Sequence, residues 1–254
     1  MCPAERNNGP SVVRRVSALL AAFRPDEVAV GVNELARRTG IPKASVSRLV
    51  AELVEEGLLE RSGGRVGLGL RLFELGERAS RRRSMREVAL PFLADLRAAT
   101  GQTVHLAVLD GAEVVYVEIL RGRDGPWLPS GVGGRLPAHA TGVGKALLAA
   151  APPDVLQRVL AGGLAPVGPR TITAPGTLAA HLRRIAASGI SYEHEESAAG
   201  VACVACVIAP DGGEPVGAVS ATGWIGKVDI RRVGPAVRTT ALTIARELTA
   251  TENS

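Results

Sequence analysis

The sequence predicts an α+β protein in which a linker helix joins an N-terminal winged helix-turn-helix domain to a C-terminal domain. In residues 1–70, apolar residues at helical spacing are followed by a short hairpin signal, a combination typical of a winged helix. Residues 71–84 are rich in Arg and Glu around regularly spaced Leu, which indicates the linker helix. Residues 85–254 mix β-branched runs with amphipathic segments, which favours an antiparallel sheet flanked by helices.

Three helices are expected before the hairpin. Ser11–Phe23 carries apolar residues at the helical period and should form the first. Asn33 is a suitable N-cap for a short second helix, Glu34–Thr39, and Gly40 is its expected C-terminal stop. The third and longest, Lys43–Glu56, follows a proline suited to the first turn of a helix. A short helix, a glycine-containing turn and a longer helix together have the anatomy of a helix-turn-helix.

The longest of these helices has two faces of different character. Apolar side chains at i, i+3, i+4 and i+7 form a stripe that should face the core, consisting of Val46, Leu49, Val50 and Leu53. The candidate DNA contacts lie away from that stripe and are small, hydrogen-bonding or basic: Lys43, Ala44, Ser45, Ser47 and Arg48. Such a face suits the major groove, where arginine can pair with guanine. Any small three-helix unit would also show a buried stripe and a solvated face, so the spacing alone leaves that alternative open.

A basic hairpin follows the helix-turn-helix. Leu58–Arg61 and Arg65–Leu68 should form two short strands around Ser62-Gly63-Gly64, and their arginines could contact the sugar-phosphate backbone as a wing. Residues 1–84 hold 15 Lys and Arg against 10 Asp and Glu, so they contain the whole net charge of +5. A polyanion-binding module next to a neutral one explains this distribution, although a chance fluctuation in an arginine-rich proteome would also produce it.

The C-terminal domain should alternate strands and helices. A helix is expected over about 86–99, and Asp110-Gly111 between two β-branched runs, Thr103–Leu109 and Glu113–Leu120, predicts a hairpin. After a Gly- and Pro-rich stretch the pattern indicates helices at about 141–150, 153–161, 175–188 and 229–249, and strands near 190–195, 201–209 and 215–222. This is the composition of an α+β domain.

Motifs for metal binding and catalysis are weak. Cys203 and Cys206 have the spacing of a metal or redox pair, but positions i and i+3 of a strand point to opposite faces. The sequence lacks a Gly-x-Ser-x-Gly nucleophile elbow, and Gly142–Lys145 is too short for a P-loop. His105 lies among Val and Leu and is interpreted as a strand residue rather than a general base. We therefore expect no metal, no cofactor and no enzymatic activity.

The composition also indicates the cellular compartment in which we expect the protein. The sequence contains no apolar run of about 18 residues that could span a bilayer. Met1–Pro10 lacks the apolar region of a signal peptide. Three cysteines, two of them in one apolar stretch, argue against a disulfide framework. We expect a cytoplasmic protein with no membrane partner.

The sequence resembles the IclR family of bacterial transcriptional regulators. The likeness runs in order from about residue 11 to 250 and is carried by six strings: VNELARRTGIPKASVSRLVAELVEEGLLER at 32–61, RVGLGLRLFELG at 65–76, TGQTVHLAVLDGAEVVYVE at 100–118, GRLPAHATGVGKALLA at 134–149, GISYEHEESAAGVACVACVI at 189–208 and VGAVSATG at 216–223. The resemblance implies a winged helix, a linker helix and a GAF/PAS-like C-terminal domain that binds an effector. It also implies homodimers, often paired into tetramers, on palindromic operators.

The resemblance assigns roles to particular residues. The recognition helix of the family falls on Lys43–Glu56. The effector pocket should draw on eight positions: Trp127, Leu128, Gly142, Val143, Glu193, Cys203, Ser220 and Thr222. The family commonly has an acidic pair where this chain has Glu193-His194, an arginine at Ala202, and a proline at Trp224. The extra aromatic residue and the lost charge suggest an effector that is bulkier or more apolar than a short dicarboxylate.

The chemistry of the last strand fits small-molecule binding. Ser220 and Thr222 are two residues apart, so both hydroxyls face one side of the strand. Together with the backbone amides of Gly142 and Gly144, near the start of a helix, they would suit a carboxylate. Alternatively, the hydroxyls merely satisfy a strand edge.

These features predict a sequence-specific DNA-binding transcriptional regulator. Its operator binding would be modulated by a small organic effector, either a carboxylic acid or an aromatic metabolite. The alternatives are an effector-independent DNA- or RNA-binding protein and, as the weaker rival, an enzyme with an appended winged helix.

Overall fold

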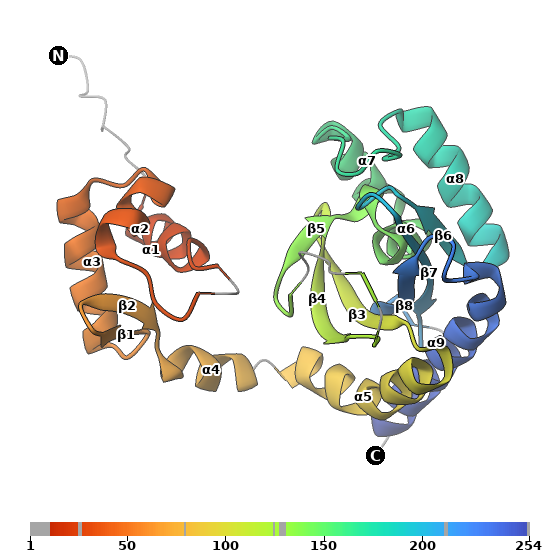
Figure 1. The fold of residues 1–254 in the computed structure, drawn as a ribbon, viewed down its shortest axis with the longest axis horizontal. Coiled ribbons are helices and arrows are strands. Elements are labelled where there is room, and N and C mark those ends of the chain that lie inside the picture. The colour runs from red at the N-terminus through yellow and green to blue at the C-terminus, as the bar shows by residue number, and fades with distance from the viewer. Residues whose placement is uncertain are drawn as a thin grey trace, which may run out of the picture. The chain divides into compact units, whose positions relative to one another are not determined.

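The computed structural model describes residues 11–24, 27–78, 80–123, 125–126, 131–210 and 213–252. The chain divides into two compact units, Met1–Ser80 and Arg81–Ser254. The first is helical with a two-stranded sheet, and the second is built on a larger sheet (Figure 1). The predicted α+β class is confirmed.

The first unit is a winged helix-turn-helix. Its elements are α1 (Val12–Ala21), α2 (Val32–Thr39), α3 (Lys43–Glu55), β1 (Leu59–Ser62), β2 (Arg65–Leu68) and α4 (Leu70–Glu77). The apolar stripe predicted on α3 is buried along its whole length. It packs with Leu19 of α1, Leu35 of α2 and Val66 of β2 in one core. Because this core fills the space among three helices and the hairpin, it fixes which face of α3 remains in solvent.

The start of α2 differs from the prediction. The helix begins at Val32, with Gly31 as its N-cap, so Asn33 lies inside the helix. The reason is local: the Gly31 carbonyl already accepts hydrogen bonds from the amides of Glu34 and Leu35. The predicted end is correct, since Gly40 adopts a left-handed φ of +67°, which glycine tolerates without strain.

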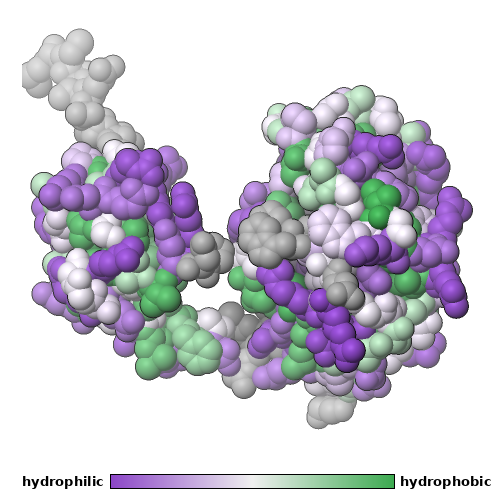
Figure 2. Space-filling model, viewed as in Figure 1, coloured by the Kyte–Doolittle hydropathy of each residue, from purple (hydrophilic) through white to green (hydrophobic). Residues whose placement is uncertain are grey.

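The segment between the two units also differs from the prediction. Helices were expected at 71–84 and about 86–99, whereas α4 ends at Glu77 and α5 runs from Ser80 to Thr100. Gly76, with its low helix propensity, lies next to the end of α4. Large apolar side chains on α4 remain exposed, among them Leu70 and Phe73, the latter 63% exposed. Figure 2 shows this apolar surface in green where α4 lies.

The second unit contains a six-stranded antiparallel sheet among its described residues. Its strands are β3 (Thr103–Asp110), β4 (Glu113–Leu120), β5 (Arg135–Pro137), β6 (Ser191–His194), β7 (Val201–Ile208) and β8 (Gly217–Trp224). They lie in the order β5-β4-β3-β8-β7-β6. The short β5 lies in the Gly- and Pro-rich stretch that the sequence left without a strand, and it pairs with the start of β4.

Helices cover both faces of this sheet (Figure 1). One face packs against α5 and α9 (Ile230–Glu252), with Leu93, Leu106, Val204 and Ile244 in a shared core. The other packs against α6 (Gly142–Ala150), α7 (Pro153–Ala161) and α8 (Pro175–Ser188). Successive residues of a strand point to opposite faces of the sheet, so alternate residues of each strand belong to the two cores. In the described part of the chain, we find no helix with the length and apolar character needed to cross a membrane.

Candidate functional site

The outward face of α3 is exposed in the first unit. Lys43, Ala44, Ser47 and Arg48 all lie in solvent, and Ser45 is half-buried. The Arg48 side chain is 70% exposed, and its Nε lies 4.0 Å from Glu52 Oε1. An ion pair this long and this exposed is weak, so the guanidinium can reorient toward another partner. The face offers one arginine among small and hydroxyl side chains, which fits the major groove.

The wing is a tight hairpin. Ser62 pairs with Arg65, so Gly63 and Gly64 form a two-residue turn, and their φ values of +53° and +76° suit a type I′ turn. Arg61 pairs with Val66, one position along. Neighbouring positions of a strand face opposite sides, so the two exposed arginines lie on opposite faces of the ribbon. The sequence could not show this separation.

Arg65→Ala should weaken binding to all DNA sequences and lower the slope of log Kd against log salt by about one. The reason is that a phosphate contact releases counterions without reading bases. The slope is measured by fluorescence anisotropy at several salt concentrations. Arg158→Ala, which removes a similarly exposed arginine from α7, serves as the control and should change nothing. An unaltered slope in Arg65→Ala would remove the wing from the interface.

An ion-pair cluster holds α2 in place. Arg38 donates to Glu27 (Nη2 to Oε1, 2.7 Å), to Glu34 (Nε to Oε1, 2.8 Å) and to the Ala22 carbonyl (2.9 Å). Hydrogen bonds from Arg38 to Glu27, and from Arg37 and Arg38 to Glu34, lower the pKa of both carboxyls to about 2. Both values lie below the ordinary 4.5, so the stabilisation is complete above pH 4.5 and is lost as pH falls toward 2. The cluster ties the segment after α1 to α2, the helix that supports α3.

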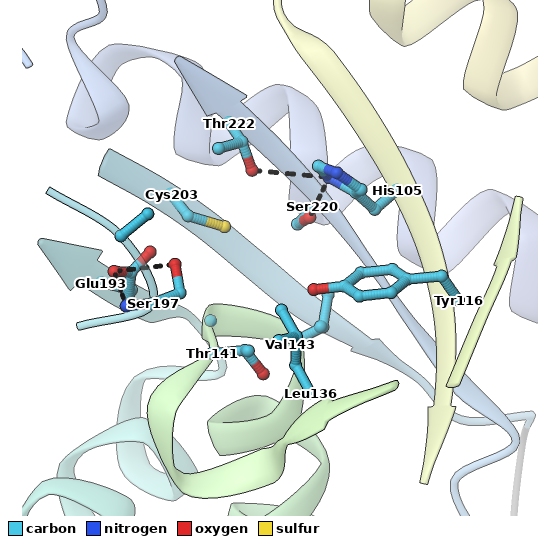
Figure 3. A pocket seen from close by; sticks show the side chains of 12 residues that line it. His105, Tyr116, Leu136, Thr141, Val143, Glu193, Ser197, Cys203, Ser220 and Thr222 are labelled. Carbon is cyan, nitrogen blue, oxygen red and sulfur yellow. Dashed lines mark hydrogen bonds between the residues drawn. The ribbon is translucent and has the colours of Figure 1, made fainter. Parts of the chain in front are cut away.

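A pocket lies in the second unit, on the sheet face that packs against α6. It is a hollow that opens to solvent, with a cavity volume of about 30 Å³. Its lining comes from all six strands of the sheet, the start of α6 and the β6–β7 turn: His105, Tyr116, Leu136, Thr141, Gly142, Val143, Glu193, Ser197, Ala198, Cys203, Ser220 and Thr222 (Figure 3).

The pocket contains six of the eight predicted effector residues. Gly142, Val143, Glu193, Cys203, Ser220 and Thr222 come from α6, β6, β7 and β8 and meet in this one hollow. The remaining two, Trp127 and Leu128, lie outside the described residues. Residues far apart in the sequence converge here because β6, β7 and β8 are neighbours in the sheet.

Small side chains make the hollow. Cys203 pairs with Thr222, and Ala205 pairs with Ser220, so this face of β7 and β8 carries only small residues there. Gly142 approaches β7 so closely that a Cβ at this position would lie 2.8 Å from Cys203 Sγ. Larger residues at these positions would fill the space that a ligand needs.

The start of α6 corrects one prediction. The Gly144 amide, expected to bind a carboxylate, donates instead to the Thr141 hydroxyl at 3.0 Å as part of the helix cap. The amides of Gly142 and Val143 carry no hydrogen bond to another described residue. They lie in the first turn of α6, where the helix dipole favours negative charge. Among the amides of this first turn, those of Gly142 and Val143 are therefore the ones left without a partner in the described part of the chain.

Glu193 is a buried carboxyl in the pocket wall. Its side chain accepts from the amides of Glu196 at 2.6 Å and Ser197 at 3.1 Å, and it is 1% exposed. Burial, the largest effect, raises its pKa to about 7 despite these hydrogen bonds. The group is therefore neutral and charged in comparable amounts near neutral pH.

A buried ion pair holds the β6–β7 turn against α6. Lys145 is 0% exposed, and its Nζ donates to Glu196 Oε1 at 2.5 Å and to the Tyr192 carbonyl at 3.1 Å. The Glu196 carbonyl in turn accepts from the Gly168 amide and the Thr171 hydroxyl. The turn that carries Ser197 and Ala198 into the pocket is thus anchored from two sides.

The positions that depart from the family pattern do not line the pocket. His194 is exposed, and Ala202 packs in the core formed with α5 and α9, on the opposite face of the sheet. The Trp224 ring lies beside Gly200, away from the lining. These three residues therefore give no support for a bulkier or more apolar effector, and that expectation stays a prediction.

The two cysteines of β7 lie on opposite faces, as the strand period predicts. Cys203 lines the pocket, whereas Cys206 packs in the core beside α9. Burial raises the pKa of each thiol to about 12, which keeps both protonated.

Sequence reasoning missed several lining residues. His105 was placed in a strand without a role, and Tyr116, Thr141 and Ser197 were not singled out. The sequence shows that His105 and Thr103, two residues apart in one strand, share a face of the sheet. It does not show that His105 pairs with Ser220 of β8. Only that long-range register puts the imidazole beside the predicted hydroxyls.

Known domains match both units. Residues 12–63 match the IclR helix-turn-helix domain, and residues 78–246 match the domain described as "Bacterial transcriptional regulator IclR C-terminal". The chain is similar to the transcriptional repressor IclR of Escherichia coli, with 28% identity over 91% of this chain and 90% of the relative. It is 31% identical to the regulator Rv1719 of Mycobacterium tuberculosis, over 80% of this chain and 78% of that protein.

Solved structures agree with these matches. An IclR homolog from Microbacterium hydrocarbonoxydans, crystallised with 4-hydroxybenzoate, is 33% identical with a TM-score of 0.87, over 94% of this chain and all of that chain. The IclR of Thermotoga maritima is 30% identical with a TM-score of 0.73, over 93% of this chain and 98% of that chain. The domain matches, the sequence relatives and the two-unit fold agree, and the chain belongs to the IclR family of DNA-binding transcriptional regulators.

Proposed function

We propose that this regulator binds its operator through the exposed face of α3 and the β1–β2 wing, and that a small aromatic monocarboxylic acid bound in the pocket controls that binding. The observation that supports an effector site is the convergence of hydroxyls, free helix amides and a buried carboxyl around one hollow. An effector that prefers one conformation of the second unit would shift the population of DNA-binding states.

The pocket chemistry favours a single carboxylate attached to an apolar body. None of the described lining residues is Lys or Arg, so the amides of Gly142 and Val143 would bind the negative charge. Tyr116, Leu136 and Val143 would contact the apolar part. The 4-hydroxybenzoate in the Microbacterium hydrocarbonoxydans relative supports the same ligand class.

The architecture of the working assembly is part of the same proposal. The protein would act in the cytoplasm as a homodimer or a dimer of dimers on a palindromic operator, with recognition helices about 34 Å apart. The exposed apolar side chains of α4 support burial against a second copy. Residues 1–70 would bind DNA, 71–84 would link the domains, and 85–254 would bind the effector and assemble without catalysing a reaction.

The test is a footprint on the DNA flanking the gene of this protein, with and without 4-hydroxybenzoate. Protection of a palindrome that changes with the acid is the expected result. A matched series of benzoate, 4-hydroxybenzoate and succinate separates aromatic monoacids from short diacids. Protection that none of the acids alters would refute effector control, and absence of any protected site would refute operator binding.

The affinity for 4-hydroxybenzoate should fall with rising pH, by up to about tenfold per unit above pH 7. Burial raises the Glu193 pKa from its ordinary 4.5 to about 7, so above pH 7 a charged Glu193 would repel a bound carboxylate. The same shift makes folding less favourable as pH rises from 4.5 through 7, because the folded state binds the extra proton. Calorimetric titration between pH 6 and 9 measures the effect. Glu193→Gln should show flat affinity, and an equal slope in both proteins would exclude Glu193.

A further inference from the structure

One ring nitrogen of His105 has hydrogen-bond partners among the described residues, and the other has none. The imidazole is 3% exposed on the pocket face of β3, with its ring centroid 5.3 Å from that of Tyr116. Its Nδ1 lies 3.3 Å from Ser220 Oγ and 3.5 Å from Thr222 Oγ1. Its Nε2 is buried and has no hydrogen-bond partner in the described part of the chain.

A buried nitrogen without a partner costs free energy, and ligand pockets are where such groups gain one. Nε2 lies on the edge of the imidazole ring that is remote from the backbone. Nδ1 faces the hydroxyls of the neighbouring strand β8, and the residue lines the pocket, so Nε2 is the ring nitrogen left for a ligand there. Figure 3 shows the ring on the sheet side of the pocket with Ser220 and Thr222, and Thr141 and Val143 on the helix side.

The imidazole is neutral over the working pH range. Burial, with a smaller effect from Arg121, lowers the His105 pKa to about 4. A neutral imidazole has one N–H donor and one acceptor nitrogen. The hydroxyls of Ser220 and Thr222 can either donate to Nδ1 or accept from it, so they tolerate both tautomers. Nε2 is therefore able to donate to a ligand oxygen or to accept from a ligand hydroxyl.

We propose that His105 is a specificity-determining residue, whose Nε2 binds a second polar group of the effector, at the end remote from its carboxylate. This rests on the proposed function, in which the carboxylate lies at the Gly142 and Val143 amides. The apolar body of the ligand would lie beside Tyr116, between the two polar ends. The pocket would thus select acids that carry a hydroxyl or carbonyl at the far end, and would discriminate against acids that leave Nε2 unpaired.

Two pairs of acids test this, each differing by one distal hydroxyl: benzoate with 4-hydroxybenzoate, and hexanoate with 6-hydroxyhexanoate. In calorimetric titrations of the full-length protein, we expect the hydroxylated member of at least one pair to bind at least about tenfold more tightly. His105→Asn keeps a polar atom near the Nδ1 position and loses the distal one, so the ratio should fall to near one. His105→Gln keeps a polar atom near the Nε2 position and should retain most of the ratio.

The outcomes separate the two proposals. Equal affinity for both members of each pair in the wild type, or an unchanged ratio in His105→Asn, overturns the role of His105 and leaves effector binding in place. Absence of binding by all four acids overturns both. Thermal melts verify that the variants are folded. The Nε2 resonance of His105 in ¹⁵N spectra gives a second readout. It should shift when the hydroxylated acid binds and stay unchanged when the acid without the hydroxyl binds. Equal shifts with both acids would also overturn the role of His105.

Discussion

Arg48→Ala is expected to weaken operator binding by roughly ten- to a hundredfold, while binding to unrelated DNA changes little. The Arg48 side chain is exposed on the outward face of α3, and its one ion pair with another described residue is the 4.0 Å contact to Glu52. A bidentate contact from this guanidinium to guanine would read sequence rather than charge. The measurement is the ratio of Kd for operator and scrambled duplex, by anisotropy at fixed salt.

Arg48→Lys is the matched control. Lysine keeps the charge but cannot reproduce the planar, two-pronged contact, so discrimination should fall while the salt dependence stays near wild type. The core-facing residues of α3 are untouched, so both variants should melt at the wild-type temperature. Sequence preference that is unchanged in Arg48→Ala would contradict the assignment of α3 as the recognition helix.

The first unit was predictable because its signals are local. The stripe of α3 occupies two turns of one helix, Gly40 ends α2 through its own backbone, and Gly63-Gly64 determines the hairpin turn. Each depends on residues within about ten positions of one another. The errors, at the start of α2 and the end of α4, are shifts of boundary within the correct elements.

The pocket was predictable only in part, because its geometry is non-local. The alternation of Ser220 and Thr222 gave the correct shared face, since period 2 belongs to the strand itself. The pairing of His105 with Ser220 joins residues more than a hundred positions apart, and no local pattern encodes it. The Gly144 amide was misassigned because the helix was expected to begin at about 141, whereas Thr141 is its N-cap and accepts from that amide.

Lys145→Met should lower the free energy of unfolding by about 3–5 kcal/mol, a melting shift on the order of 10 °C. Lys145 is fully buried, and its loss would leave the Glu196 carboxylate buried without its cation. The β6–β7 turn carries Ser197 into the pocket, so binding of 4-hydroxybenzoate should weaken as well. Differential scanning calorimetry and ligand titration measure the two effects on the same sample.

The double variant Lys145→Met/Glu196→Leu separates loss of packing from an uncompensated charge. Replacing both members of a buried pair by apolar residues is often nearly neutral, so most of the stability should return. The turn would keep its second anchor, because the Glu196 carbonyl still accepts from Gly168 and Thr171. If the double variant is as unstable as the single one, the pair stabilises the fold through packing. The unpaired Glu196 carboxylate is then not the cause of the lost stability. If stability returns without ligand binding, the ion pair positions the pocket wall rather than merely supporting the fold.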